Sequence, residues 1–164
     1  MNKILLSTAL FLIVNLSWAQ APEEAFDFWV GEWDITYTNQ KGEEIKAKNT
    51  ITKVLDGKVI EENFEDPKGS GLLGKSISVY NPRTKTWHQA WADNQGSYFD
   101  FVGEIEGENR IFRTKMVEKD GKQIIQRMRF YDISEDSFVW DWESTTDNGK
   151  TWTLAWRLNY SRAN

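Results

Sequence analysis

A few side chains of this 164-residue chain have the types and spacing that chemistry requires. His88 is the only imidazole, so a Ser-His-Asp arrangement would have to use it, and a multi-His metal site is excluded. The acid pairs Glu61-Glu62 and Asp141 with Glu143 could perform general acid–base catalysis. The chain has no cysteine, which excludes a thiol nucleophile, a disulfide scaffold and a Cys-ligated metal or iron–sulfur site.

Strand alternation argues against catalysis by these groups. His88 alternates with Trp87 and Gln89, so it faces solvent if the Trp face points inward. The two adjacent glutamates face opposite ways, and Asp141 and Glu143 lie opposite the aromatic row of their strand, which predicts solvated charges. We therefore expect no catalytic residue, no metal and no cofactor.

The aromatic residues point to binding instead. Gln89 lies between Trp87 and Trp91 on one face of a strand, and a buried amide needs polar partners from the protein or from a ligand. Trp140 and Trp142 share a face of another strand and could grip a flat or apolar molecule. The same indoles could equally be core packing.

A basic strand offers an anchor for an anionic group. Arg127 and Arg129 alternate with Met128 and Phe130, so one pair faces inward, and the pattern does not say which. An inward arginine could hold a carboxylate or phosphate. We expect Arg127 and Gln89 to orient a ligand.

These side chains must be positioned by short strands. Nine turn signals divide the chain after residue 30, which implies ten strands, and Asp-Gly pairs supply the positive φ angles of tight hairpins. The signals are at 40–42, 56–57, 66–69, 81–82, 94–96, 106–107, 120–121, 134–136 and 147–149.

Alternation within the strands predicts one buried and one wet face. Residues 152, 154, 156, 158 and 160 are all Trp, Leu or Tyr and form one row of the last strand. Ten sequential hairpin-linked strands favour an all-β, antiparallel, up-and-down barrel. Residues 21–29 predict a short helix, with Pro22 in its first turn, that plugs one end of the barrel.

Charge and the N-terminus restrict partners and destination. The net charge of −5 and pI near 5.0 argue against nucleic acid. Residues 1–19 have the charged start, short apolar middle and small-x-small exit of a signal peptide cleaved after Ala19. We expect one domain over 20–164, secreted or periplasmic, without a membrane anchor and with no assignable oligomeric state.

The residues Gly31-Glu32-Trp33 at the head of the first strand resemble the opening motif of lipocalins and their calycin relatives. Together with 26–34, 55–57, 79–82, Trp87, Trp91, Asp93, 126–128 and 147–152, they look like a secreted bacterial family of lipocalin-like domains of unknown function. The resemblance implies that Trp33 packs across the barrel floor beneath a basic residue, for which Arg162 is the candidate and Arg157 the second choice.

Residues 145–152 match the Asp-box pattern Ser/Thr-x-Asp-x-Gly-x-Thr-Trp. The pattern describes a hairpin in which Asp147 accepts turn N–H groups and Gly149 takes a positive φ, and we expect Trp152 to drop into the core. We interpret it as structural.

The sequence thus predicts an exported barrel that binds a small apolar or aromatic molecule and performs no chemistry of its own. Alternatives are a hydrolase or isomerase using the same cavity, a carbohydrate-binding domain, or a structural barrel packed solid. An enzyme requires an inward-facing acid or His within hydrogen-bond reach of the pocket, whereas a binding protein requires only an aromatic lining.

Overall fold

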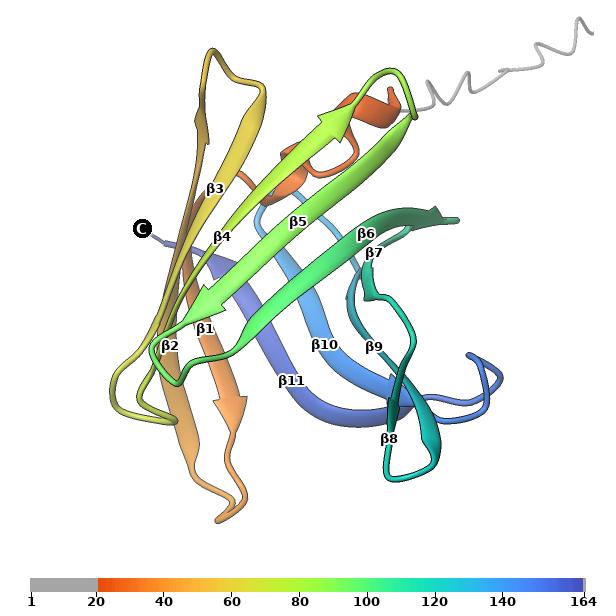
Figure 1. The fold of residues 1–164 in the computed structure, drawn as a ribbon. Helices are drawn as coiled ribbons and strands as arrows, with labels where there is room; N and C mark the ends of the chain where they lie inside the picture. Colours follow the sequence, from red (N-terminus) through yellow and green to blue (C-terminus); the bar gives the residue numbers. More distant parts are fainter. Residues whose placement is uncertain (1–20, 164) are drawn as a thin grey trace, which may run out of the picture.

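The computed structural model describes residues 21–163, so the expected signal peptide lies outside the described residues. Eleven strands follow a short helical segment (Figure 1). They are β1 Gly31–Thr38, β2 Glu44–Val54, β3 Val59–Asp66, β4 Leu72–Asn81, β5 Thr86–Asp93, β6 Tyr98–Glu106, β7 Asn109–Thr114, β8 Val117–Lys119, β9 Lys122–Tyr131, β10 Ser137–Thr145 and β11 Thr153–Arg162. Over this range no helix is long and apolar enough to cross a bilayer.

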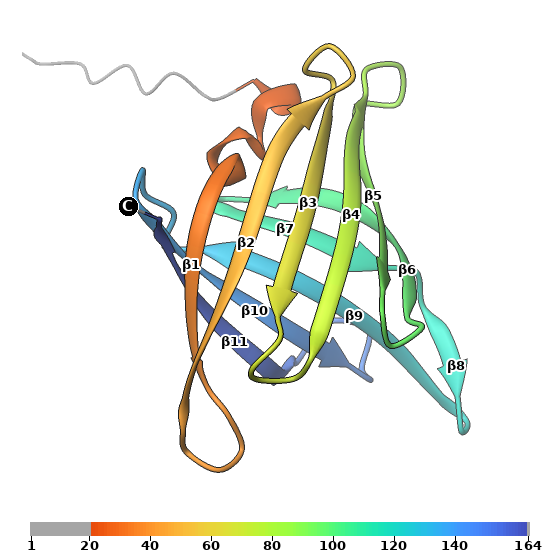
Figure 2. The same ribbon diagram turned by 90° about the vertical axis from the view of Figure 1, so that its left-hand side faces the viewer.

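Ten of these strands close into an antiparallel barrel. The strands from β1 to β7 each pair with the next, β7 pairs with β9, and β9, β10 and β11 continue the ring until β11 pairs with β1. The short strand β8 pairs only with β9 and stands outside the ring. Figure 2 shows the strands crossing one another around a common interior. The predicted ten-stranded up-and-down barrel is confirmed.

Each of the nine turn signals lies at a connection between strands, and three of them begin on the last residue of a strand, Asp66, Asn81 or Glu106. At three of them consecutive residues take positive φ: Leu55, Asp56 and Gly57 (50°, 57° and 74°), Asp120 and Gly121 (52° and 72°), and Asn148 and Gly149 (59° and 85°). Asp120 and Gly121 form the two-residue turn between β8 and β9, which requires positive φ. A further connection, residues 115–116 between β7 and β8, was not predicted, because Lys115 and Met116 are not residues typical of turns.

The N-terminal segment plugs one end of the barrel. It forms two short 3-10 turns, Pro22–Glu24 and Asp27–Trp29. Phe26, between them, is fully buried and stacks on Phe112 with ring centroids 4.3 Å apart. Trp87 Nε1 donates a 2.8 Å hydrogen bond to the Pro22 carbonyl, which fixes the plug to β5.

Trp33 and Arg162 meet at this plugged end. The guanidinium carbon of Arg162 lies 3.9 Å from the Trp33 ring centroid, a cation–π contact. The same guanidinium donates to the carbonyls of Val30 (2.7 Å) and Phe28 (3.2 Å). Gly31, at φ 142°, leaves room for it, because a Cβ there would overlap Arg162.

The inward side chains form three layers between the plug and the open end. Next to the plug the layer is aromatic and aliphatic, with Trp33, Phe130 and Phe138 fully buried. The middle layer is polar on the β2–β5 side and apolar on the β9–β11 side. The third layer, near the open end, is again aromatic and surrounds the cavity described below.

Candidate functional site

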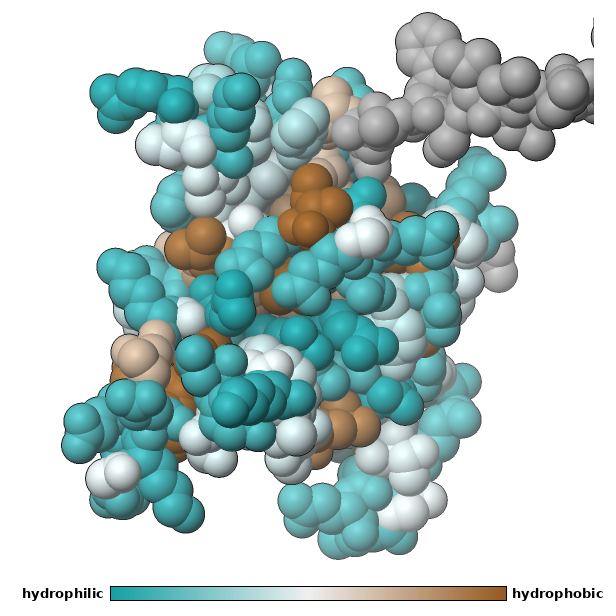
Figure 3. All heavy atoms as spheres, turned by 90° about the vertical axis from the view of Figure 1, so that its right-hand side faces the viewer, coloured by the Kyte–Doolittle hydropathy of each residue, from teal (hydrophilic) through white to brown (hydrophobic). Residues whose placement is uncertain are grey.

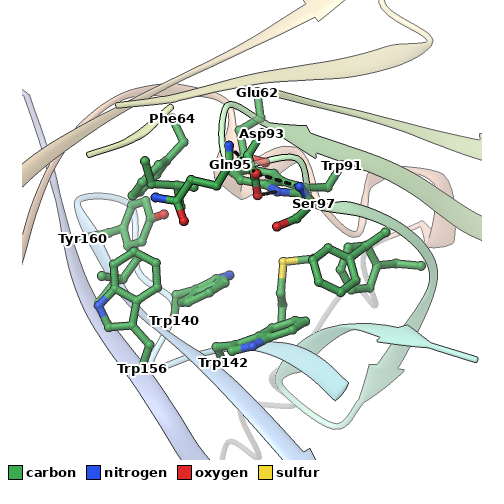
Figure 4. A pocket seen from close by; sticks show the side chains of 15 residues that line it. Glu62, Phe64, Trp91, Asp93, Gln95, Ser97, Trp140, Trp142, Trp156 and Tyr160 are labelled. Atoms are coloured by element: carbon green, nitrogen blue, oxygen red, sulfur yellow. Dashed lines mark hydrogen bonds between the residues drawn. The ribbon is translucent and has the colours of Figure 1, made fainter. Parts of the chain in front are cut away.

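A cavity of about 280 Å³ opens at the end of the barrel away from the plug. Its 15 lining residues come from β3, β4, β5, β6, β9, β10 and β11 and from the β5–β6 turn (Figure 4). Most of the lining is aromatic: Phe64, Trp91, Phe99, Phe101, Trp140, Trp142, Trp156 and Tyr160. The barrel is therefore hollow at this end and packed at the other.

The aromatic rings of the lining hold one another in place. Trp140 and Trp142 are nearly parallel, with an interplanar angle of 8° and centroids 6.4 Å apart. Trp156 stands perpendicular to Trp140 at 5.9 Å, and Phe64 packs edge-on against Trp156 at 6.0 Å. The four indoles of the lining are only partly buried, so they present ring surface to the cavity. Figure 4 shows Trp140 and Trp142 across the open space from Trp91.

An aspartate orders the rim of the cavity that lies opposite Trp140 and Trp142. Asp93, at the end of β5, accepts backbone hydrogen bonds from Gln95 (3.0 Å) and Ser97 (2.9 Å) and a 3.0 Å bond from Trp91 Nε1. These donors lower the pKa of Asp93 even though burial alone would raise it. The Trp91 ring lies over Gly74, where a Cβ would overlap it.

A carboxylic acid lies at the inner end of the cavity. Glu62 points inward from the middle of β3, lines the cavity and is only 5% exposed. It accepts hydrogen bonds from Asn49 Nδ2 (2.8 Å) on β2 and from Ser76 Oγ (2.6 Å) on β4. Burial raises the pKa of Glu62 to about 7, against the opposing effect of these two donors. Glu62 can therefore give or take a proton near neutral pH.

The polar layer around Glu62 continues on both sides. Asn49 Nδ2 also donates to the Tyr160 hydroxyl (3.2 Å), and burial together with the nearby Glu62 raises the pKa of Tyr160. Gln89 Nε2 donates to Ser78 Oγ (3.0 Å). The side-chain amide oxygens Asn49 Oδ1 and Gln89 Oε1 are buried without a hydrogen-bond partner. Unmatched acceptors in a closed interior are uncommon, and they favour a donor from outside the protein.

Glu62 corrects an expectation from the sequence. The Glu61-Glu62 pair was expected to be solvated, and Glu61 does face outward, 3.5 Å from Lys75. Its neighbour instead lies inside, because the alternation of β3 buries Ile60, Glu62 and Phe64 together. The apolar residues at positions 60 and 64 were the signal that could have placed Glu62 in the interior.

The expected ligand-binding residues separate into two groups. Trp91, Trp140 and Trp142 line the cavity. Trp87 packs on the plug, 5.2 Å from the Phe26 ring, and Gln89 is buried in the polar layer; neither lines the cavity. Trp156 and Phe64 were not singled out from the sequence, although Trp156 shares the row of Leu158 and Tyr160.

Arg127 does not face the cavity. Met128 lines the cavity, so its neighbour Arg127 points to the outside of the barrel. There it donates to Glu143 (2.7 Å) and lies 3.8 Å from the Trp152 ring centroid. This corrects the expectation that Arg127 orients a ligand inside the barrel.

Trp152 was expected in the core and is instead on the outer surface. The pairing of β10 with β11 shifts between Trp142 and Glu143: Trp142 pairs with Trp156, but Glu143 pairs with Leu154. Ala155 is thus the extra residue of a β-bulge, and the bulge reverses which side chains face inward. As a result Trp156 lines the cavity, whereas Leu154 is 45% exposed.

Asp147 organises the turn before β11 as the Asp-box pattern predicts. Its carboxylate accepts hydrogen bonds from Thr151 N (2.9 Å), Thr151 Oγ1 (2.6 Å) and Thr145 Oγ1 (2.7 Å). Gly149 takes a φ of 85°.

Asp141 and Glu143 face outward, as expected, but they are not solvated. Asp141 is 1% exposed because Arg157 covers it and donates two 2.7 Å hydrogen bonds. Glu143 is covered in the same way by Arg127. These ion pairs explain the acids as structural groups of the outer surface. His88 is exposed there as well.

The fold and the cavity together define a closed antiparallel barrel with an aromatic interior site, which is consistent with a lipocalin-like fold. No protein-family model matches the chain, and no curated protein matches it significantly.

Proposed function

We propose that this chain is an exported member of a bacterial lipocalin-like family and that it binds a small apolar or aromatic molecule in its barrel. The observation that carries the proposal is the open cavity, in which four partly buried indoles, Trp91, Trp140, Trp142 and Trp156, surround empty space. A barrel with a purely structural role would gain stability by filling that space, because an empty apolar cavity forfeits packing.

The size of the cavity restricts the ligand. A volume of about 280 Å³ is just below the roughly 300–1,000 Å³ typical of sites for drug-sized molecules. It corresponds to the liquid volume of about nine water molecules. One ring with a short side chain fits this volume, whereas a long-chain lipid or a porphyrin does not.

The proposal is tested by ligand retention. The purified protein is equilibrated with a metabolite mixture, and retained molecules are identified by native mass spectrometry. We expect one molecule per chain in the wild type and in the control Trp152→Phe, whose indole lies outside the barrel, and loss of retention in Trp142→Ala. Retention of nothing by the wild type would contradict the proposal and favour a structural role.

Glu62 supports a second candidate, a hydrolase or isomerase in the same cavity. An inward acid next to the pocket is what such an enzyme requires, and its pKa of about 7 suits general acid–base catalysis at neutral pH. Incubation of each retained molecule with the protein distinguishes the two candidates. An enzyme converts it and loses turnover in Glu62→Gln, whereas a binding protein releases it unchanged.

A further inference from the structure

We propose that the cavity selects an organic cation, an amine whose ammonium group lies beside Glu62 and whose hydrocarbon part lies among the indoles. This inference rests on the proposed binding function and adds the chemical class of the ligand. Three features of the cavity carry it: the sign of its charged groups, the exposed ring faces, and the unused hydrogen-bond capacity of the Glu62 carboxylate.

The charged side chains of the cavity are all acidic. Glu62 lies at its inner end and Asp93 at its rim, and among the described residues no Lys, Arg or His lines it. Arg127, the cation that could have received an anionic head group, faces the outside of the barrel. An anionic ligand would meet carboxylates without a counter-charge in a partly closed site, which selects against it.

The walls of the cavity also favour a cation. The face of an indole ring carries negative electrostatic potential and attracts an ammonium group within about 6 Å, most strongly where water is excluded. Trp140 and Trp142 stack parallel on one side, and Trp91 lies on the other side of the open space (Figure 4). An ammonium group entering between them meets ring faces before it reaches Glu62.

The Glu62 carboxylate can accept more hydrogen bonds at the inner end of the cavity than the protein supplies. Each Glu62 oxygen accepts one hydrogen bond from the protein, from Asn49 or from Ser76, and a carboxylate oxygen can accept more than one. The side-chain oxygens Asn49 Oδ1 and Gln89 Oε1 in the same layer also lack a hydrogen-bond partner, but neither residue lines the cavity, so the inference rests on Glu62. An ammonium group brings three donors to this carboxylate.

Protonation of Glu62 gives the proposal a pH signature. The groups that face Glu62 are Asn49 from β2, Ser76 from β4 and Tyr160 from β11, and of these only Tyr160 titrates, above its ordinary range. Asp93, at the rim, stays ionised because its pKa is lowered. A cation binds the ionised form of Glu62 more tightly, so its affinity falls as the pH drops below about 7.

The experiment compares three probes of nearly the same shape: 2-phenylethylamine, the neutral 2-phenylethanol and the anionic 3-phenylpropionate. Their dissociation constants are measured by isothermal titration calorimetry at about pH 8, where Glu62 is mostly ionised. We expect the amine to bind at least about tenfold more tightly than the alcohol, and the anion to bind most weakly.

Two variants test the role assigned to Glu62. Glu62→Gln should weaken amine binding about tenfold or more and change alcohol binding little. The matched control is Glu61→Gln, on the adjacent outward-facing position of β3, which should change neither. If Glu62→Gln does not fold, the wild type still decides: between about pH 8 and pH 5.5 amine binding should weaken about tenfold while alcohol binding stays constant.

The outcomes separate this inference from the proposed function. Equal affinities for the three probes, or a preference for the alcohol or the anion, would overturn the selection for cations and leave the binding function standing. Absence of binding by all three at millimolar concentration would overturn both. Amine binding that is unchanged in Glu62→Gln, or that does not depend on pH, would also contradict the inference.

Discussion

Asn49 Nδ2 donates a 2.8 Å hydrogen bond to Glu62 inside the barrel. This contact joins the adjacent strands β2 and β3 through a buried carboxylic acid, which does not contribute to apolar packing. On the opposite side the interior is apolar, with Met128 and Leu158 on the cavity wall. Burying an acid costs folding free energy unless its partners compensate fully. A polar side facing an apolar side is the arrangement that orients an amphipathic ligand.

Glu62 should make the protein less stable as the pH rises from about 4.5 to about 7. The pKa of Glu62 is about 7 in the folded chain and near the ordinary value of 4.5 in the unfolded chain. The folded state therefore holds a proton that the unfolded state releases between these values, so the contribution of Glu62 to stability is greatest below about pH 4.5, falls as the pH rises, and is lowest above about pH 7. The shift corresponds to about 3 kcal/mol.

Chemical denaturation at a series of pH values, comparing wild type with Glu62→Gln, checks this dependence. We expect Glu62→Gln to remove most of the decline and to be the more stable protein at about pH 8. Wild-type stability that rises between about pH 5 and pH 7 would show that Glu62 is not held protonated by burial.

Gly74→Ala should obstruct the cavity without straining the backbone. A Cβ at position 74 would overlap the Trp91 indole, which would have to move toward the cavity space. We expect ligand affinity to fall about tenfold and stability to fall by about 1–3 kcal/mol. The control is Lys75→Ala, an exposed neighbour on the same strand. If Gly74→Ala and the control bind the ligand with equal affinity, the placement of the Trp91 indole over Gly74 is contradicted.

Arg127→Ala should reduce stability and leave ligand binding unchanged. The substitution removes the cation that covers the buried Glu143 on the outer surface, which costs about 3 kcal/mol. Thermal unfolding measures the first effect, and titration with 2-phenylethylamine measures the second. A large loss of affinity in a folded Arg127→Ala protein would place this side chain in the cavity after all.

Arg162→Ala should loosen the plugged end. It removes the cation–π contact with Trp33 and the hydrogen bonds to the carbonyls of Val30 and Phe28, with an expected cost of about 3 kcal/mol. Arg162→Lys should not restore this stability, because a lysine cannot make the same forked set of hydrogen bonds. Limited proteolysis within residues 22–30 should become faster in both variants.

The strands and most turns could be predicted because their signals are local. Tight turns require positive φ, which Asp-Gly pairs readily adopt, and the alternation of aromatic residues marks the buried face of single strands. The connection between β7 and β8 was not predicted, because Lys115 and Met116 are not residues typical of turns.

The candidate site was harder to predict because it depends on relations between strands. The bulge at Ala155 reverses the alternation of β11, so a single row of Trp and Leu in the sequence divides between the cavity and the outer surface. The inward direction of Met128, and hence the outward direction of Arg127, follows from pairing with β7 and β10, which the pattern of β9 alone does not contain. Glu62 was missed because an acid in a strand is usually solvated.

The most direct test of the central claim is a titration followed through the indole N–H signals in 1H–15N NMR spectra, using 2-phenylethylamine and then 2-phenylethanol. If the cavity binds aromatic molecules, the signals of Trp91, Trp140, Trp142 and Trp156 shift together with one dissociation constant, while those of Trp29, Trp33, Trp87 and Trp152 stay in place. Shifts confined to the second group, or no saturable shift in any indole, would contradict it.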